Sequence, residues 1–198
     1  MSLEAWAALA QVGTFVVIAA TAAASLVQLR HLRAANQVAA LRLLMDQYEG
    51  AELRDAFHFV RVELAGRLED PAFRVELLSY QTDRLRHPEV TICNFFDTWG
   101  LNYREGAIEK RAFMRIMAGV TVWFWKELEP VIAMSVNSND VNTSFQNFEY
   151  LAVEASEWLA VHPDGDYPRG KPRMPLVNPW RETDRAATPI EPSRPSTD

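Results

Sequence analysis

The hydrophobic and polar positions of this chain change character twice, from an uncharged N-terminal run to an amphipathic middle and then to a proline-rich end. Residues 5–29 carry no charge over 25 consecutive positions. As a helix this run would be about 37 Å long, whereas the hydrocarbon core of a bilayer is about 30 Å thick. Because lipid offers the backbone no hydrogen-bond partners, a helix is the expected form. Residues 1–29 are therefore predicted to be a transmembrane anchor; the alternative is a buried helix of a soluble protein.

The charges beside this run predict its orientation. Only four residues precede it and none of them is basic, so we expect an uncleaved anchor rather than a signal peptide. Arg30 and Arg33 follow it directly. By the positive-inside rule, the N-terminus would lie outside and the rest of the chain in the cytoplasm, with Arg30 and Arg33 contacting lipid headgroups.

The polar residues within the run lie on one side of the predicted helix. Together with Ile18 they follow a 3-4-3-4-3 spacing and fall within an arc of about 100°. Membrane helices associate through small and polar residues, so this seam predicts contact with a second copy of the chain or with a partner membrane helix. The alternative is that its side chains reach headgroups or bond back to their own helix. The seam consists of Gln11, Thr14, Thr21, Ser25 and Gln28.

Apolar residues continue at helical spacing beyond the membrane run as far as Gly50, which is the first good stop signal. We therefore expect one continuous helix over about 5–48, in which residues 30–50 form a juxtamembrane helical stalk.

Residues 51–162 repeat apolar positions at intervals of three and four, which predicts a small cytoplasmic helical bundle and an all-α fold class. Its first helix is expected over about 52–68. A second begins with Asp70 as N-cap and Pro71 as first residue, and reaches toward Leu85. A third runs from about Pro88 to Gly106 and buries one face, made of Ile92, Phe95, Phe96, Trp99 and Tyr103.

Two more helices are expected in the second half of this domain. One begins near Glu109, includes the run 120–125, and is kinked or restarted at Pro130. A loop over 137–142 follows it. Thr143 and Gln146 then fit a capping box for the last helix. The apolar stripe of that helix is Phe148, Leu151, Ala152, Ala155 and Leu159.

The composition changes abruptly after His162, because eight of the 11 prolines lie between Pro163 and Pro195. Proline lacks the backbone donor that helices and sheets use, so residues 163–198 are predicted to be a mostly disordered Pro-rich tail. Its apolar residues Leu176, Val177 and Trp180 would complete the domain core if the tail folded back.

Charge and chemical motifs narrow the classes of function. Residues 51–162 hold 11 basic and 17 acidic side chains, which argues against a nucleic-acid partner. Cys93, the one cysteine, lies in an apolar helix and is expected in the core. No metalloprotease, phosphate-loop or nucleophile motif occurs, and no two histidines share a helix at ligand spacing. We therefore expect no metal, no cofactor and no catalytic residue.

Five segments of the sequence carry a resemblance to a known family. They are AQVGTFVVI with QLRHLRAANQ, ICNFFDTWGLNYREGAI, WFWKELEPVI and NFEYLA. Over about residues 8–155 the chain resembles an uncharacterised bacterial family of short proteins with one N-terminal membrane helix and a cytoplasmic helical domain of unknown function. Thr98 stands where that family often has a second acidic residue. The resemblance implies the same topology, a bacterial inner membrane location, and no assigned activity.

The matching segments offer one possible motif site, made of Asn94, Asp97 and Asn147. These polar residues are expected to cap or bridge helix ends, and the alternative is a ligand site. The functional prediction is a membrane-tethered helical interaction module, a subunit or regulator of another membrane protein. A membrane-anchored ligand or stress sensor is the second class, and a membrane-bound enzyme is the third.

Overall fold

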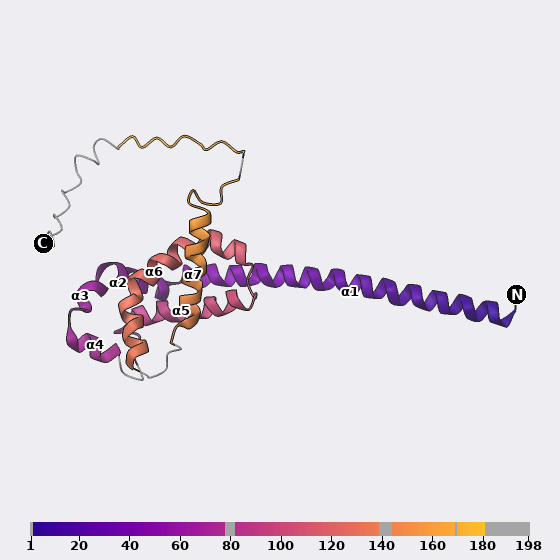
Figure 1. The fold of residues 1–198 in the computed structure, drawn as a ribbon, viewed down its shortest axis with the longest axis horizontal. Coiled ribbons are helices and arrows are strands. Elements are labelled where there is room, and N and C mark those ends of the chain that lie inside the picture. Colours follow the sequence, from indigo (N-terminus) through magenta and orange to yellow (C-terminus); the bar gives the residue numbers. More distant parts are fainter. Residues whose placement is uncertain (1, 78–81, 139–143, 169, 181–198) are drawn as a thin grey trace. The chain divides into compact units, whose positions relative to one another are not determined.

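A computed structural model describes residues 2–77, 82–138, 144–168 and 170–180 (Figure 1). The described residues form seven α-helices and no strand, so the predicted all-α fold class is confirmed. In chain order the helices are α1 (Leu3–Tyr48), α2 (Ala51–Val62), α3 (Leu64–Arg67), α4 (Pro71–Leu77), α5 (Pro88–Arg104), α6 (Lys110–Ser138) and α7 (Gln146–Val161).

The helix α1 is a single element of 46 residues, as the uninterrupted apolar spacing predicts. Among the described residues it is the one helix long and apolar enough to cross a membrane. The side chains of residues 11–36 are all exposed. The ribbon of α1 meets the other helices only toward its C-terminal end (Figure 1). Gly50 follows the C-cap residue Glu49, and a Cβ at Gly50 would lie 3.0 Å from the carbonyl oxygen of Gln47, so the turn after α1 leaves little room for a side chain there.

The helix predicted over 52–68 is two helices in the structure. The break falls at Glu63, where φ is −112°. The predicted apolar face is nevertheless buried on both sides of the break, through Leu53 and Val60 on α2 and Leu64 on α3. The apolar spacing therefore identified buried positions correctly, but the prediction of one unbroken helix was wrong.

The helix α4 begins where the Asp70 N-cap predicts it. The Asp70 carboxylate accepts a hydrogen bond from the backbone N–H of Ala72 at 2.9 Å. The predicted extension to Leu85 is wrong, because Leu85 lies in a turn with 93% of its surface exposed. The intervening positions 78–81 are outside the described residues.

The predicted face of α5 is entirely buried, and Cys93 lies in the core beside it. The next helix, α6, does not restart at Pro130 but continues through it. Proline removes one helical hydrogen bond. Burial of Leu128, Val131 and Ile132 on either side holds the helix together at this point. The predicted loop is also too long at its start, because residues 137 and 138 belong to α6; residues 139–142 are outside the described residues.

The core lies where α5 and α6 both pack against α7 and α2 packs against α5. Stacked aromatic rings join these helices. The ring centroids of Phe96 and Phe148 are 4.8 Å apart, and those of Phe57 and Phe124 are 4.5 Å apart. Leu159, predicted on the buried stripe of α7, is an exception with 37% of its surface exposed.

The chain divides into two compact units, Met1–Gly165 and Asp166–Asp198. The described residues of the second unit contain no helix. Within them, Leu176 and Val177 are 98% and 85% exposed, and Trp180 is also exposed.

Candidate functional site

The C-terminal end of α1 is built into the helical domain. Leu44 is completely buried, and the Tyr48 ring lies 5.2 Å from that of Phe57 on α2. The Trp99 indole N–H on α5 donates a hydrogen bond of 3.0 Å to the side-chain oxygen of Gln47. The last turns of α1 are thus fixed to both α2 and α5.

A cavity of about 440 Å³ opens at this junction. Its walls come from the end of α1, the start of α2, and one face of α5, with Arg84 at the side. The α2 N-terminus in its wall has no side-chain cap. The polar side chains around it are Gln47, Glu52, Arg84, Thr91, Asn94 and Thr98. Amide, hydroxyl and guanidinium donors outnumber the single carboxylate, so the cavity suits a small polar molecule that accepts hydrogen bonds.

Asp97 and Asn147 come together as a helix cap. The Asp97 carboxylate accepts the backbone N–H groups of Asn147 at 2.9 Å and Phe148 at 3.1 Å. Its other oxygen accepts the side-chain amide of Asn147 at 3.2 Å. An anion on α5 therefore satisfies the free N–H groups and positive end of α7. Asn94, the third residue of the proposed motif site, lies instead in the wall of the junction cavity.

The predicted capping box of α7 is wrong in register. The N-cap is Phe145, whose φ of 59° is left-handed, and no side chain caps the helix from that position. Gln146 is the first helical residue and not the third, and Thr143 is outside the described residues. The acidic side chain on α5 supplies the cap that the local sequence does not.

Gly100 lets α5 and α7 approach closely enough for this cap. A Cβ at Gly100 would lie 2.1 Å from the carbonyl oxygen of Asn147, well inside van der Waals contact. The close helix approach at this glycine is therefore made to the first turn of α7.

A buried cluster of histidine and glutamate side chains before α5 was not anticipated from the sequence. His87 and Glu89 are 1% and 0% exposed, and His87 Nδ1 lies 2.8 Å from Glu89 Oε1. His87 Nε2 lies 3.4 Å from Glu76, which pairs with Arg86 at 2.9 Å. Burial raises the pKa of Glu89, and the hydrogen bond from His87 opposes that shift. The only local signal was a histidine and a glutamate flanking Pro88, a pattern usually found on a surface.

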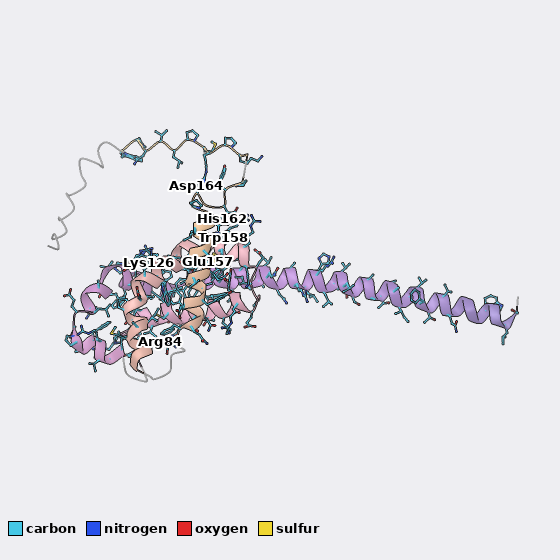
Figure 2. The ribbon with its side chains drawn as sticks, viewed as in Figure 1. Arg84, Lys126, Glu157, Trp158, His162 and Asp164 are labelled. Carbon is cyan, nitrogen blue, oxygen red and sulfur yellow. The ribbon has the colours of Figure 1, made fainter. Side chains whose placement is uncertain are left out.

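The remaining histidines lie apart from this cluster. His31 and His58 are exposed on α1 and α2. His162 follows α7, where its Nδ1 lies 2.9 Å from the carbonyl oxygen of Trp158 and its ring stacks on that indole at 4.1 Å (Figure 2). Within the described ranges, no three His, Cys, Asp or Glu side chains are placed to hold a metal ion.

The seam residues on α1 are all exposed, and so are Arg30 and Arg33. Two of the hydroxyls bond to their own helix. Thr21 donates to the carbonyl oxygen of Val17 at 2.8 Å, and Ser25 donates to that of Thr21 at 2.9 Å. The amides of Gln11 and Gln28 are therefore the strongest side-chain donors left on the seam.

Comparison with known proteins identifies a family to which the sequence is similar. A family model described as a domain of unknown function, DUF4760, matches residues 15–158. No curated protein and no solved structure matches the chain. The matched range begins within α1 and ends within α7, so it includes the junction of α1 with the domain and the Asp97 cap.

Proposed function

The chain belongs to the DUF4760 family, a domain of unknown function, and on the basis of its structure we propose that it is a membrane-tethered helical interaction module. In this proposal it serves as a subunit or regulator of another membrane protein. It is not proposed to catalyse a reaction or to carry a cofactor.

The observation that carries the proposal is the continuity of α1. One helix includes the exposed apolar residues 11–29 and also Leu44, which is fully buried in the domain. A helix without a break transmits rotation and displacement along its axis. Contacts made by the anchor in the membrane would therefore reach α2 and α5 through the hydrogen bond of Gln47 and the ring contacts of Tyr48.

The proposed location is a bacterial inner membrane, crossed once, with the N-terminus outside and the domain in the cytoplasm. The exposed Arg30 and Arg33 after the apolar run support this orientation. The acidic domain would be repelled by anionic lipid, which leaves these two arginines as the headgroup contacts.

A crosslinking experiment on membranes tests the proposal. The full chain, carrying an affinity tag after Asp198, is crosslinked in native membranes and purified. A matched control has residues 5–29 replaced by an unrelated alternating Leu/Ala span. We expect a membrane protein to be captured with the natural chain and lost with the control. Equal recovery with both chains, or none with either, would contradict the proposal.

A ligand sensor is the second candidate, and the junction cavity favours it. Its walls include Gln47 and Trp99, whose hydrogen bond joins α1 to α5, so a bound molecule would change how firmly α1 is held. Asn94→Leu fills and depolarises the cavity, whereas Asn102→Leu changes an amide farther along α5. The purified full chain should then release a retained small molecule in the Asn94→Leu variant only. Retention unaffected by Asn94→Leu would place the molecule elsewhere.

A further inference from the structure

We propose that α1 carries one continuous interface for a second copy of this chain, and that this interface runs from Gln11 through the membrane and along the stalk to Leu43. The inference deepens the proposed function and rests on it, because it takes residues 5–29 as the membrane span.

The stalk part of α1 keeps apolar side chains on its surface. Leu32 and Leu43 are 59% and 53% exposed, and Ala35 and Ala39 are exposed between them. Counted from Gln28, these positions follow at spacings of four, three, four and four residues, so they extend the seam without a break. The line covers residues 11–43, which is about 48 Å of helix.

The polarity of this line is the opposite of what each environment would favour. In the lipid-facing part it is polar, through Gln11, Thr14, Thr21, Ser25 and Gln28. Past Arg30, where water surrounds the stalk, it becomes apolar. Lipid cannot hydrogen-bond the side-chain amides of Gln11 and Gln28, and water solvates the apolar second half poorly. A protein partner along the whole line resolves both mismatches.

The domain leaves this line free. Its core packs against Ala40, Leu41, Leu44, Met45 and Tyr48 of α1. At 100° per residue the centre of the stalk line lies about 165° around the helix from the centre of that group. The side chains of α1 stand away from the other helices over most of its length (Figure 2). A second helix can therefore lie along the line without meeting the domain of its partner.

A second copy of the chain is the partner whose polar and apolar positions match this line along its whole length. In a parallel pair, equivalent positions face one another, so the change from polar to apolar falls at the same height on both helices. Gln11 and Gln28 each carry a donor and an acceptor, so two identical glutamines can pair. Beyond the apolar part, Arg42 and Asp46 are exposed and make no ion pair with one another in the described structure. Each Arg42 can pair with the Asp46 of the other copy.

Disulfide trapping in membranes tests this arrangement with adjacent alanines. Ala35→Cys lies on the line, and Ala34→Cys lies about 100° away on the side toward the domain. The natural Cys93 is buried and present in both variants. On mild oxidation of the full chain, Ala35→Cys should give several-fold more disulfide-linked dimer than Ala34→Cys. Equal dimer from both variants, or dimer from neither, would overturn the proposal.

A second pair of variants tests the membrane half. Gln11→Leu with Gln28→Leu removes both amides, and Ala19→Leu with Ala23→Leu adds the same side chains on the opposite side of α1. Two differently tagged full-length copies of the natural chain should co-purify from membranes, and so should two copies of the Ala19→Leu, Ala23→Leu variant. Two copies of the Gln11→Leu, Gln28→Leu variant should no longer co-purify. Equal retention in all three forms would contradict the proposal. Capture of an unlike protein in place of the second copy would overturn it in favour of a hetero-partner.

Extraction of the same membranes at alkaline pH separates this proposal from the proposed function. A chain that remains in the membrane and gives no seam-specific dimer refutes the second copy while leaving the anchor intact. A chain released by alkali refutes the membrane span, and the interface proposal falls with it.

Discussion

The carboxylate of Asp97 on α5 caps the first turn of α7 by accepting the backbone N–H of Asn147 at 2.9 Å. The two residues are 50 positions apart, so this contact sets the position of α7 relative to α5. The cap also depends on Gly100, where α5 and α7 approach each other closely.

Removing the cap should destabilise the domain. Asp97→Ala leaves the N–H groups of Asn147 and Phe148 without their partner, and we expect a loss of about 1–3 kcal/mol in the free energy of unfolding. Asp97→Asn keeps an acceptor but loses the charge at the helix N-terminus, so its loss should be smaller. Urea unfolding of the full chain in detergent measures both, with the exposed Asp55→Ala as control. Equal stability of Asp97→Ala and Asp55→Ala would contradict the structural role.

The packing of α5 on α7 predicts a large difference between two glycines. In Gly100→Ala the new methyl group would lie 2.1 Å from the Asn147 carbonyl oxygen, and the helices would have to move apart. We expect a loss of about 1–3 kcal/mol, together with weakening of the Asp97 cap. Gly119→Ala on α6 meets nothing within 4 Å and should be neutral or stabilising by about 0.5–1 kcal/mol. Thermal unfolding followed by circular dichroism distinguishes them, and similar shifts for both would refute the close approach.

The buried Glu89 predicts a pH dependence of stability. Burial raises the pKa of this carboxyl above its ordinary value of 4.5 in the folded state. Its contribution to stability is therefore full below pH 4.5 and is lost as pH rises through the folded pKa. Glu89→Gln keeps the shape of the neutral carboxyl and does not ionise.

The measurement is the difference in free energy of unfolding between the natural chain and Glu89→Gln across a pH series. Relative to the variant, the natural chain should lose stability as pH rises above 4.5. A pH-independent difference for Glu89→Gln would contradict the prediction.

The orientation proposed from Arg30 and Arg33 predicts the outcome of a reporter fusion. A reporter joined after Asp198 should be active if it needs the cytoplasm and inactive if it needs the periplasm. Exchanging the charges, with Arg30→Gln and Arg33→Gln and two arginines placed before residue 5, should weaken or reverse this preference. Activity of a periplasmic reporter on the natural chain would reverse the proposed topology.

The proline density of residues 163–198 predicts that the tail is dispensable for folding. Proline lacks the backbone donor that helices and sheets use, so removing residues 170–198 should take no regular element out of the domain. The truncated chain should melt within about 1–2 °C of the full chain and keep its helical content. A drop of 10 °C or more, well beyond the few degrees that correspond to about 1 kcal/mol, would show that tail residues complete the core.

The positions of most helices could be predicted because their signals are local. The stripe through Ile92 and Trp99 is buried as expected, and Asp70 caps α4 as expected. The errors fell where neighbouring elements decide the outcome. Core packing carries α6 through Pro130, and an acidic residue on another helix replaces the capping box predicted at Thr143.

By itself, the sequence determined the all-α fold class and the long N-terminal helix, and it predicted the seam of Gln11 to Gln28. Each follows from the composition and spacing of residues within a few helical turns, where helix formation and preference for lipid or water add up locally. The tertiary structure alone decided that Asp97 caps α7 and that His87 and Glu89 are buried together. It also decided that the domain packs on the side of α1 opposite the seam. These features depend on atoms far apart in the chain meeting within about 3 Å, and no local pattern specifies such a meeting.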